Sequence, residues 1–149
     1  MGKFKKLWKH YLLQSVLAGG IFSILVFALG RERIVLISAM GATSFIVFAM
    51  PNTVSAKTRN VVGGHLVGLV SGAILYFLTL PYLLAYPLVV GIAIFLMVTL
   101  GLEHPPAAGT ALAVVVNEVS YDAFITVMVS ALVLSQCRYY MRHYLRDLI

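Results

Sequence analysis

No Asp, Glu, Lys or Arg occurs anywhere from Asn60 through Leu102. A helix needs about 20 apolar residues to cross a bilayer, so this uncharged run is long enough for two membrane-spanning helices joined by a turn. The stretch "TLPYLLAYP", in which Pro81 and Pro87 interrupt the apolar sequence, marks the turn. The whole chain is 61% hydrophobic and only 11% charged, which excludes an ordinary soluble domain. The sequence therefore predicts an integral membrane protein.

Six apolar segments divide the chain. Four are long enough to cross a bilayer, and two are short and rich in small residues. Their approximate ranges are 11–29, 34–50, 61–80, 84–102, 105–117 and 123–140. Each half, 10–80 and 82–145, reads long, short, long, which is typical of transporters with inverted repeats. We predict one all-α transmembrane domain over 1–149, with four long helices and two short or half-length helices in a 3+3 inverted repeat.

The basic residues gather at the ends of the apolar segments, and the net charge is +6. This placement follows the positive-inside rule and does not form the single basic face of a nucleic-acid-binding protein. If the two short segments cross the membrane, only Arg31 and Arg33 of the basic residues lie outside; if they are re-entrant, more do. The rule therefore favours six crossing segments over four spans with two re-entrant segments. We expect a multi-pass protein of the plasma membrane, with cytoplasmic N- and C-termini and an uncleaved first span.

The stretch "HPPAAGT" carries a histidine and two prolines between two apolar segments. Proline is well tolerated in the first turn of a helix, so a helix is expected to begin here, with His104 near its cap. A helix start has unpaired amides and partial positive charge, which suit a small anion. The amides of Ala107 and Ala108 are expected to be free, and Thr110 adds a hydroxyl one turn later.

In the other half, "SAMGATS" offers a similar pattern, with Ser38 as a possible helix cap. Two such helix starts facing each other near the middle of the bilayer would form an anion site with uncharged walls. The residues predicted for this site are His104, Pro105, Pro106, Ala107, Ala108, Gly109 and Thr110 from the second half, and Gly41, Thr43 and Ser44 from the first.

The stretch "AKTRNVVGGH" is the other concentration of polar residues. Its Arg59 is either a cytoplasmic anchor or part of the site, and Asn60 is a candidate helix cap. His65 lies one turn into an apolar helix, and an ionisable residue inside a membrane is a functional candidate. We therefore add Arg59, Asn60 and His65 to the predicted substrate-binding residues. The acidic residues at segment ends, Glu103, Glu118 and Asp122, are expected to be solvated.

The segment 61–80 carries Gly64, Gly68 and Gly72, four residues apart. Small residues at this spacing let another helix approach closely in a membrane. The stripe predicts either helix packing within one subunit or a seam between two subunits. Because a chain of this size has a small core, we expect a homo-oligomer, most simply a homodimer. The single cysteine, Cys137, excludes an internal disulfide.

Two blocks of this sequence, "EHPPAAGTAL" and "GATSFIVFAMP" with the following "AKTRNVVGGH", resemble the HPP family of small integral membrane proteins. The resemblance covers roughly residues 11–140. Thr58 is a departure, since proline is expected before the Arg-Asn pair. Members from plastids and cyanobacteria are associated with nitrite transport, and the family is usually described with four transmembrane helices. The resemblance therefore implies a membrane protein that carries nitrite or a similar anion.

The preferred function is a transporter or channel for a small anion such as nitrite, with His65 and His104 near its pathway. One alternative is a membrane scaffold or partner subunit that carries no solute. A third is an intramembrane metalloenzyme that uses His65, His104 and Glu103, although the spacing matches no metal motif. We expect no enzymatic activity, no cofactor and no bound metal. The expected partners are a small inorganic anion, the lipid bilayer and further copies of the chain, and no nucleic acid.

Overall fold

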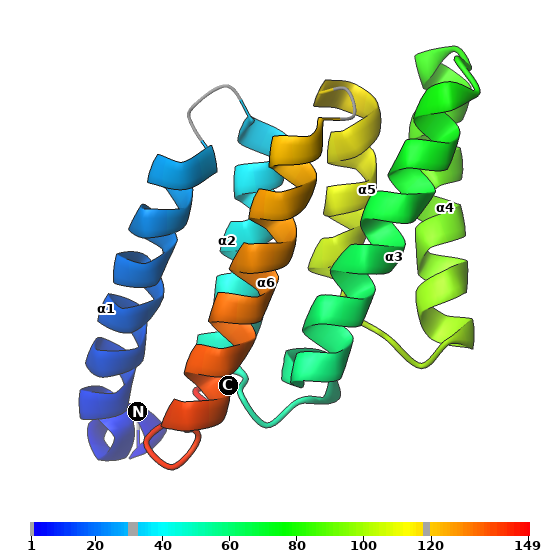
Figure 1. Ribbon diagram of the computed structural model, residues 1–149. Coiled ribbons are helices and arrows are strands. Elements are labelled where there is room, and N and C mark those ends of the chain that lie inside the picture. The colour runs from blue at the N-terminus through cyan, green and yellow to red at the C-terminus, as the bar shows by residue number, and fades with distance from the viewer. Residues whose placement is uncertain (1, 30–32, 118–119) are drawn as a thin grey trace.

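The computed structural model describes residues 2–29, 33–117 and 120–149, and these residues form six α-helices and one 3₁₀ turn (Figure 1). The elements are α1 (Gly2–Leu29), α2 (Ile34–Ala49), η1 (Val54–Ala56), α3 (Thr58–Phe77), α4 (Tyr82–Thr99), α5 (Pro106–Asn117) and α6 (Tyr121–Met141). Within α1, α3, α4 and α6 lie four apolar spans of 18 to 21 residues, while α2 and α5 are shorter. The prediction of an all-α membrane protein with four long and two short helices is confirmed.

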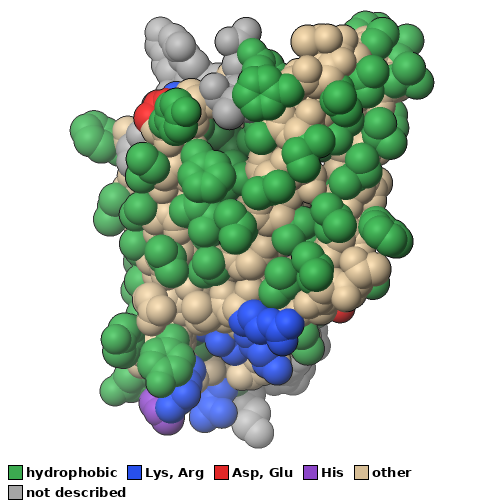
Figure 2. Space-filling view, turned by 45° about the vertical axis from the view of Figure 1, so that its right-hand side comes forward, with side chains coloured by type: hydrophobic (Ala, Val, Ile, Leu, Met, Phe, Trp, Pro, Cys, Tyr) green, Lys and Arg blue, Asp and Glu red, His purple; other side chains and the backbone are tan. Residues whose placement is uncertain are grey.

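Successive helices run in alternating directions, and both termini lie at the same end of the molecule (Figure 1). Most of the described Lys and Arg side chains gather at this end, with Arg33 at the start of α2 as an exception, and large apolar side chains cover the surface above them (Figure 2). Such an apolar belt is expected of helices that face lipid. The chain is therefore a multi-pass membrane protein. The inverted repeat, with its halves 10–80 and 82–145, stays a prediction.

The most extensive contact between helices joins α3 to α5, and the glycine stripe of α3 makes it possible. A Cβ added at Gly72 would lie 2.6 Å from Cβ of Val114 and 2.7 Å from the carbonyl oxygen of Ala111. Gly64 and Gly68 face α5 and the loop before it in the same way. The two backbones can approach because no side chain stands between them. The stripe is therefore a packing face within one subunit, and the interpretation as a subunit seam is wrong.

Two expected helix boundaries lie elsewhere. The turn after α3 ends at Pro81, whereas Pro87 lies inside α4. Ser38 is exposed in the middle of α2, which begins four residues earlier at Ile34. The apolar residues before Ser38 continue the helix, so a hydroxyl followed by small residues did not mark a helix start. The "SAMGATS" stretch is a helix interior.

The loop between α4 and α5 begins with a glycine turn that sets its direction. Gly101 has a φ of +63°, in the left-handed region that favours glycine. The amide of Leu102 donates to the carbonyl of Met97 at 2.8 Å, and the amide of Gly101 donates to the carbonyl of Val98 at 3.2 Å. These bonds form the Schellman motif that ends many helices. The chain then turns back into the bundle, and α5 starts part of the way along it (Figure 1).

A buried glutamine joins the two ends of the chain. Gln14 of α1 donates through Nε2 to the carbonyls of Phe48 and Arg146, and its Oε1 accepts from the amide of Arg146 at 3.0 Å. The amide of Leu148 also donates to the carbonyl of Ala49 at 2.9 Å. The C-terminal segment is therefore held against α1 and the end of α2.

Candidate functional site

Four of the predicted site residues meet at the centre of the bundle. Thr43 comes from α2, His65 from α3, His104 from the loop before α5, and Thr110 from α5 itself. All four have no exposed surface. Buried polar groups in a membrane are costly unless they are paired, and residues of this kind mark sites of function. The cluster is therefore the candidate functional site.

Hydrogen bonds link the four side chains in a row. Thr43 Oγ1 lies 2.9 Å from His65 Nε2 and 3.1 Å from His104 Nε2. The other ring nitrogen of His65 lies 2.9 Å from Thr110 Oγ1, and that of His104 lies 2.8 Å from the carbonyl oxygen of Ser55. The two imidazoles stand edge to face, with ring centroids 5.0 Å apart. Every imidazole nitrogen in the cluster thus has a polar partner.

The start of α3 holds the loop that carries His104. Arg59 donates to the carbonyl of Leu100 at 3.2 Å, and Asn60 Nδ2 lies 3.3 Å from both the backbone and the carboxylate oxygen of Glu103. α3 begins at Thr58 without a side-chain cap, so the prediction that Asn60 caps it is wrong. Arg59 and Asn60 position the loop and do not reach the cluster.

The predicted anion site at two helix starts is wrong in its geometry. In the second half, α5 begins at Pro106, as expected from the proline pair. The amides of Ala107 and Ala108, however, donate to the carbonyls of His104 and Pro105 at 2.9 and 3.1 Å, so they are not free. In the first half, Thr43 lies inside α2, where backbone amides are paired within the helix. Side chains, and not helix starts, provide the polar groups of the site.

The remaining predicted residues lie around the cluster without joining it. A Cβ added at Gly41 would lie 3.4 Å from the ring of Phe22, and one added at Gly109 would lie 3.4 Å from Cβ of Ala39, which is ordinary van der Waals contact in both cases. Ser44 is buried, and its hydroxyl has no hydrogen-bond partner.

Two further predicted residues, Pro105 and Ala108, line a surface pocket of ≈ 270 Å³ together with residues of α4 and with Glu103 and His104. This pocket reaches the loop side of the cluster. Within the described part of the chain, no three His, Cys, Asp or Glu side chains come together as a metal site would require.

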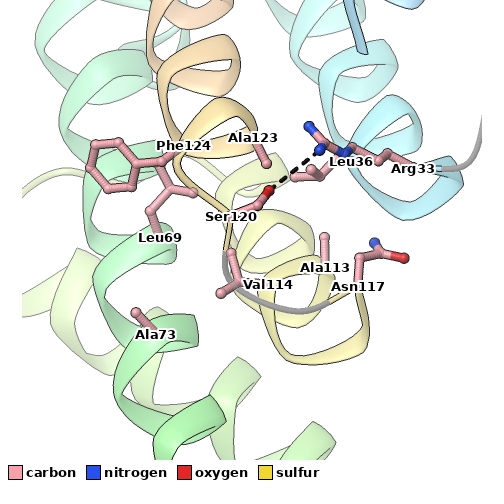
Figure 3. A pocket seen from close by; sticks show the side chains of 10 residues that line it. All are labelled: Arg33, Leu36, Leu69, Ala73, Ala113, Val114, Asn117, Ser120, Ala123 and Phe124. Carbon is pink, nitrogen blue, oxygen red and sulfur yellow. Dashed lines mark hydrogen bonds between the residues drawn. The ribbon is translucent and has the colours of Figure 1, made fainter. Parts of the chain in front are cut away.

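A second cluster of polar residues, which the sequence did not predict, lies near the C-terminal end of α5 (Figure 3). A small pocket there is lined by Arg33, Asn117 and Ser120 among apolar side chains of α2, α3, α5 and α6. Arg33 is ion-paired with Asp122 and lies 3.3 Å from the hydroxyl of Ser120. The Nδ2 atom of Asn117 is buried without a partner. Asp122, expected to be merely solvated, is thus also an ion-pair partner.

The charged residues Arg31 and Glu118, for which the sequence predicted exposed positions, lie outside the described residues.

The helical periodicity places the small pocket and the buried cluster on the same faces of three helices. On α5, Thr110, Ala113, Val114 and Asn117 follow one another at spacings of three, one and three residues, so they form one stripe. The separation of seven positions between Thr110 and Asn117 corresponds to about 10 Å along the helix axis. Leu36 of α2 and Leu69 of α3 fill the space beside this stripe, and both are 2% exposed.

Comparison with known proteins agrees with this architecture. Residues 5–146 match the family described as HPP, transmembrane region. The chain is also 29% identical, over 116 residues, to a transmembrane protein of Dictyostelium discoideum; the match covers 72% of this chain and 41% of the relative, so the chain spans less than half of that protein's length. No solved structure matches the chain. The family match extends over nearly the whole chain and includes both histidine blocks: the protein belongs to the HPP family of transmembrane proteins.

Proposed function

We propose that this protein moves a small monovalent anion across the membrane along the faces that α2, α3 and α5 turn toward one another. The observation that carries the proposal is the placement of hydrogen-bond donors at both ends of these faces. Arg33 and Asn117 lie at one end, and the His65–His104 cluster lies at the other. No Asp or Glu occurs in α2, α3, α4 or α5. A pathway with donors and without carboxylates suits an anion better than a cation.

The small pocket serves as one mouth of this pathway. Arg33 attracts an anion, while its pairing with Asp122 keeps it from holding one tightly. Asn117 also lines the pocket, and its buried, unpaired amide nitrogen offers a further donor there. From there an anion passes between Leu36 and Leu69 to reach Thr110 and the histidines. The conformation described here is closed, because both leucines are packed and the cluster is fully buried.

Nitrite is the first candidate substrate, because the resemblance to the HPP family implies it. Formate, nitrate and chloride are also small and monovalent, so a pathway lined by neutral donors can accept them to different degrees. The end that carries the termini also carries most of the described basic residues, and we propose that this end faces the cytoplasm of a plasma membrane. If the protein forms a homodimer, as we propose, the seam uses a surface other than the glycine stripe.

The direct test is anion uptake into liposomes that contain only this protein. Nitrite, nitrate, formate and chloride are compared between about pH 5 and 8, the range in which histidine changes its charge. We expect saturable nitrite uptake that is lost in His104→Ala and His65→Ala, with both variants still folded. Gly91→Ala is a matched control, because a Cβ there meets open space. No uptake of any anion by correctly inserted protein would refute the proposal.

That negative outcome favours the second candidate, a membrane scaffold or partner subunit. A scaffold tolerates substitution of both histidines, provided that the fold survives. The metalloenzyme alternative has less support from the geometry, because the carboxylate of Glu103 bonds to Asn60 and not to the histidine cluster.

A further inference from the structure

Five contacts at hydrogen-bond distance hold the buried cluster together, and each requires one hydrogen. Three of them involve Thr43 Oγ1, which lies 3.0 Å from Ala39 O, 2.9 Å from His65 Nε2 and 3.1 Å from His104 Nε2. The other two join His65 Nδ1 to Thr110 Oγ1 at 2.9 Å and His104 Nδ1 to Ser55 O at 2.8 Å. Two threonine hydroxyls and two neutral imidazoles carry one such hydrogen each. The uncharged cluster therefore has four hydrogens for five contacts.

The direction of each bond in the uncharged cluster follows from one fixed point. The carbonyl of Ser55 can only accept, so His104 carries its hydrogen on Nδ1. Its Nε2 can then only accept, and the hydroxyl of Thr43 is the donor beside it. With that hydrogen directed to His104, Thr43 accepts from Nε2 of His65. Nδ1 of His65 then accepts from Thr110. The two histidines thus hold opposite tautomers, and the carbonyl of Ala39, which accepts the backbone amide of Thr43 within α2, receives no hydrogen from the Thr43 hydroxyl.

One added proton supplies the fifth hydrogen, so that each of the five contacts can be a hydrogen bond. When Nε2 of His104 gains the proton, it donates to Thr43 instead of accepting from it. The hydroxyl hydrogen of Thr43 turns to the carbonyl of Ala39, which is one helical turn earlier on α2. Thr43 then accepts from both imidazoles, and all five contacts are hydrogen bonds at once. A second proton would find no unfilled contact and would place two positive rings 5.0 Å apart.

We infer that the cluster binds one proton at His104, that Thr43 is the positioning residue that makes this possible, and that the proton enters together with one monovalent anion. The anion part of this inference rests on the proposed function. A lone charge in a fully buried, otherwise uncharged cluster is costly, whereas a proton and a monovalent anion together are neutral. Transport by this site is therefore electroneutral, with one proton for each anion.

Few other ionisable groups surround His104. On α3 these are His65 inside the bundle, Arg59 at the start of the helix, and Tyr76 near its far end. Lys57 and Glu103 lie on the adjoining loops and are exposed. α2 and α5 contribute no ionisable side chain, and α4 contributes only tyrosines, Tyr82 and Tyr86. Among the described residues, the hydrogen-bond partner of His104 Nε2 is the hydroxyl of Thr43, which is why this hydroxyl decides the outcome.

Nitrogen-15 NMR of histidine-labelled, full-length protein in lipid bilayers tests the proton site without any transport. His10→Gln and His143→Gln remove the two histidines outside the cluster. At high pH we expect a hydrogen on Nδ1 of His104 and on Nε2 of His65. On acidification in buffer that contains nitrite, His104 becomes doubly protonated while His65 stays neutral. The same tautomer in both rings, or protonation of His65 first, would overturn the inference.

Substitution of Thr43 separates its hydroxyl from its volume. Thr43→Val leaves both Nε2 atoms without their shared partner, so we expect mixed tautomers and protonation of His104 only at lower pH. Thr43→Ser restores the hydroxyl and the wild-type spectrum, and it provides the test if the valine variant fails to fold. Ser44→Ala is the control, because that neighbouring hydroxyl is buried without a partner and should not affect the histidine signals.

Coupling is then measured in liposomes whose membrane potential is set by a potassium gradient and valinomycin. We expect nitrite uptake to carry protons with it at a ratio of one and to be independent of the potential. Uptake that depends on the potential would leave the proposed function intact and refute the coupling. Absence of uptake would refute the proposed function, while the NMR experiment would still decide the proton site.

Discussion

Replacing Gly72 by alanine tests the close packing of α3 against α5, on which the position of the buried cluster depends. The new Cβ would lie 2.6 Å from Cβ of Val114 and 2.7 Å from the backbone oxygen of Ala111. Ordinary van der Waals contact starts at 3.4 Å, so the helices must separate by roughly 0.8 Å at this point. Because one of the opposing atoms belongs to the backbone, a change of rotamer cannot relieve the overlap.

The magnitude follows from two opposing effects. Overpacking of a well-packed core costs about 1–3 kcal/mol, and a clash between two helix backbones belongs at the upper end of this range. Alanine gains about 1 kcal/mol over glycine inside a helix. We therefore expect Gly72→Ala to lower the free energy of unfolding by about 1–2 kcal/mol. At Gly91 of α4 a Cβ meets no atom within 4 Å, so Gly91→Ala should raise it by up to about 1 kcal/mol.

The two variants are compared by thermal unfolding in the same detergent, followed by circular dichroism. A difference of about 1–3 kcal/mol corresponds to a Tm difference of about 3–10 °C in a chain of this size, with Gly72→Ala the lower. Size-exclusion chromatography shows whether the oligomeric state has changed. If Gly72→Ala unfolds at the same temperature as Gly91→Ala or above it, the two helices do not pack as described.

Three further substitutions test other parts of the structure. Gln14→Leu removes the partner of backbone groups from α2 and the C-terminal segment, so we expect a loss of about 1–3 kcal/mol, measured by thermal unfolding, and faster proteolysis near Arg146. Gly101→Ala places a side chain at positive φ and should cost about 1–2 kcal/mol, whereas Gly101→Asn should cost less; equal Tm values for both would contradict the left-handed turn. Leu69→Ala opens the space between the small pocket and the cluster, so anion uptake per folded molecule should rise although the free energy of unfolding falls by about 2–5 kcal/mol. Uptake that merely follows the folded fraction would show that Leu69 is not a barrier.

Local patterns in the sequence were sufficient for the class of fold. The uncharged run from Asn60 to Leu102 contains α4 and all of α3 after Arg59, and the proline pair marks the start of α5 at Pro106. These features depend on hydrophobicity and on backbone restrictions at a few neighbouring residues. They can therefore be predicted from the sequence without knowing which helices are in contact.

The sequence also determined which residues could form a site, because ionisable and hydroxyl groups are rare in these apolar segments. His65, His104, Thr43 and Thr110 were each identified for this reason, and the structure brings all four together. The proposed reason for their meeting, two facing helix starts, was wrong. A hydroxyl residue followed by small residues gives the same sequence pattern whether the helix begins at the hydroxyl residue or four residues before it.

The tertiary structure alone decided what the cluster can do chemically. The carbonyl of Ser55 fixes the tautomer of His104, yet a backbone carbonyl carries no signal in the sequence. Arg33 and Asn117 are 84 positions apart and meet only because the ends of α2 and α5 lie side by side. The number of hydrogens that the cluster can hold depends on distances between atoms from separate segments. Composition limits which groups a membrane protein can bury, whereas packing between distant segments sets how those groups share their protons.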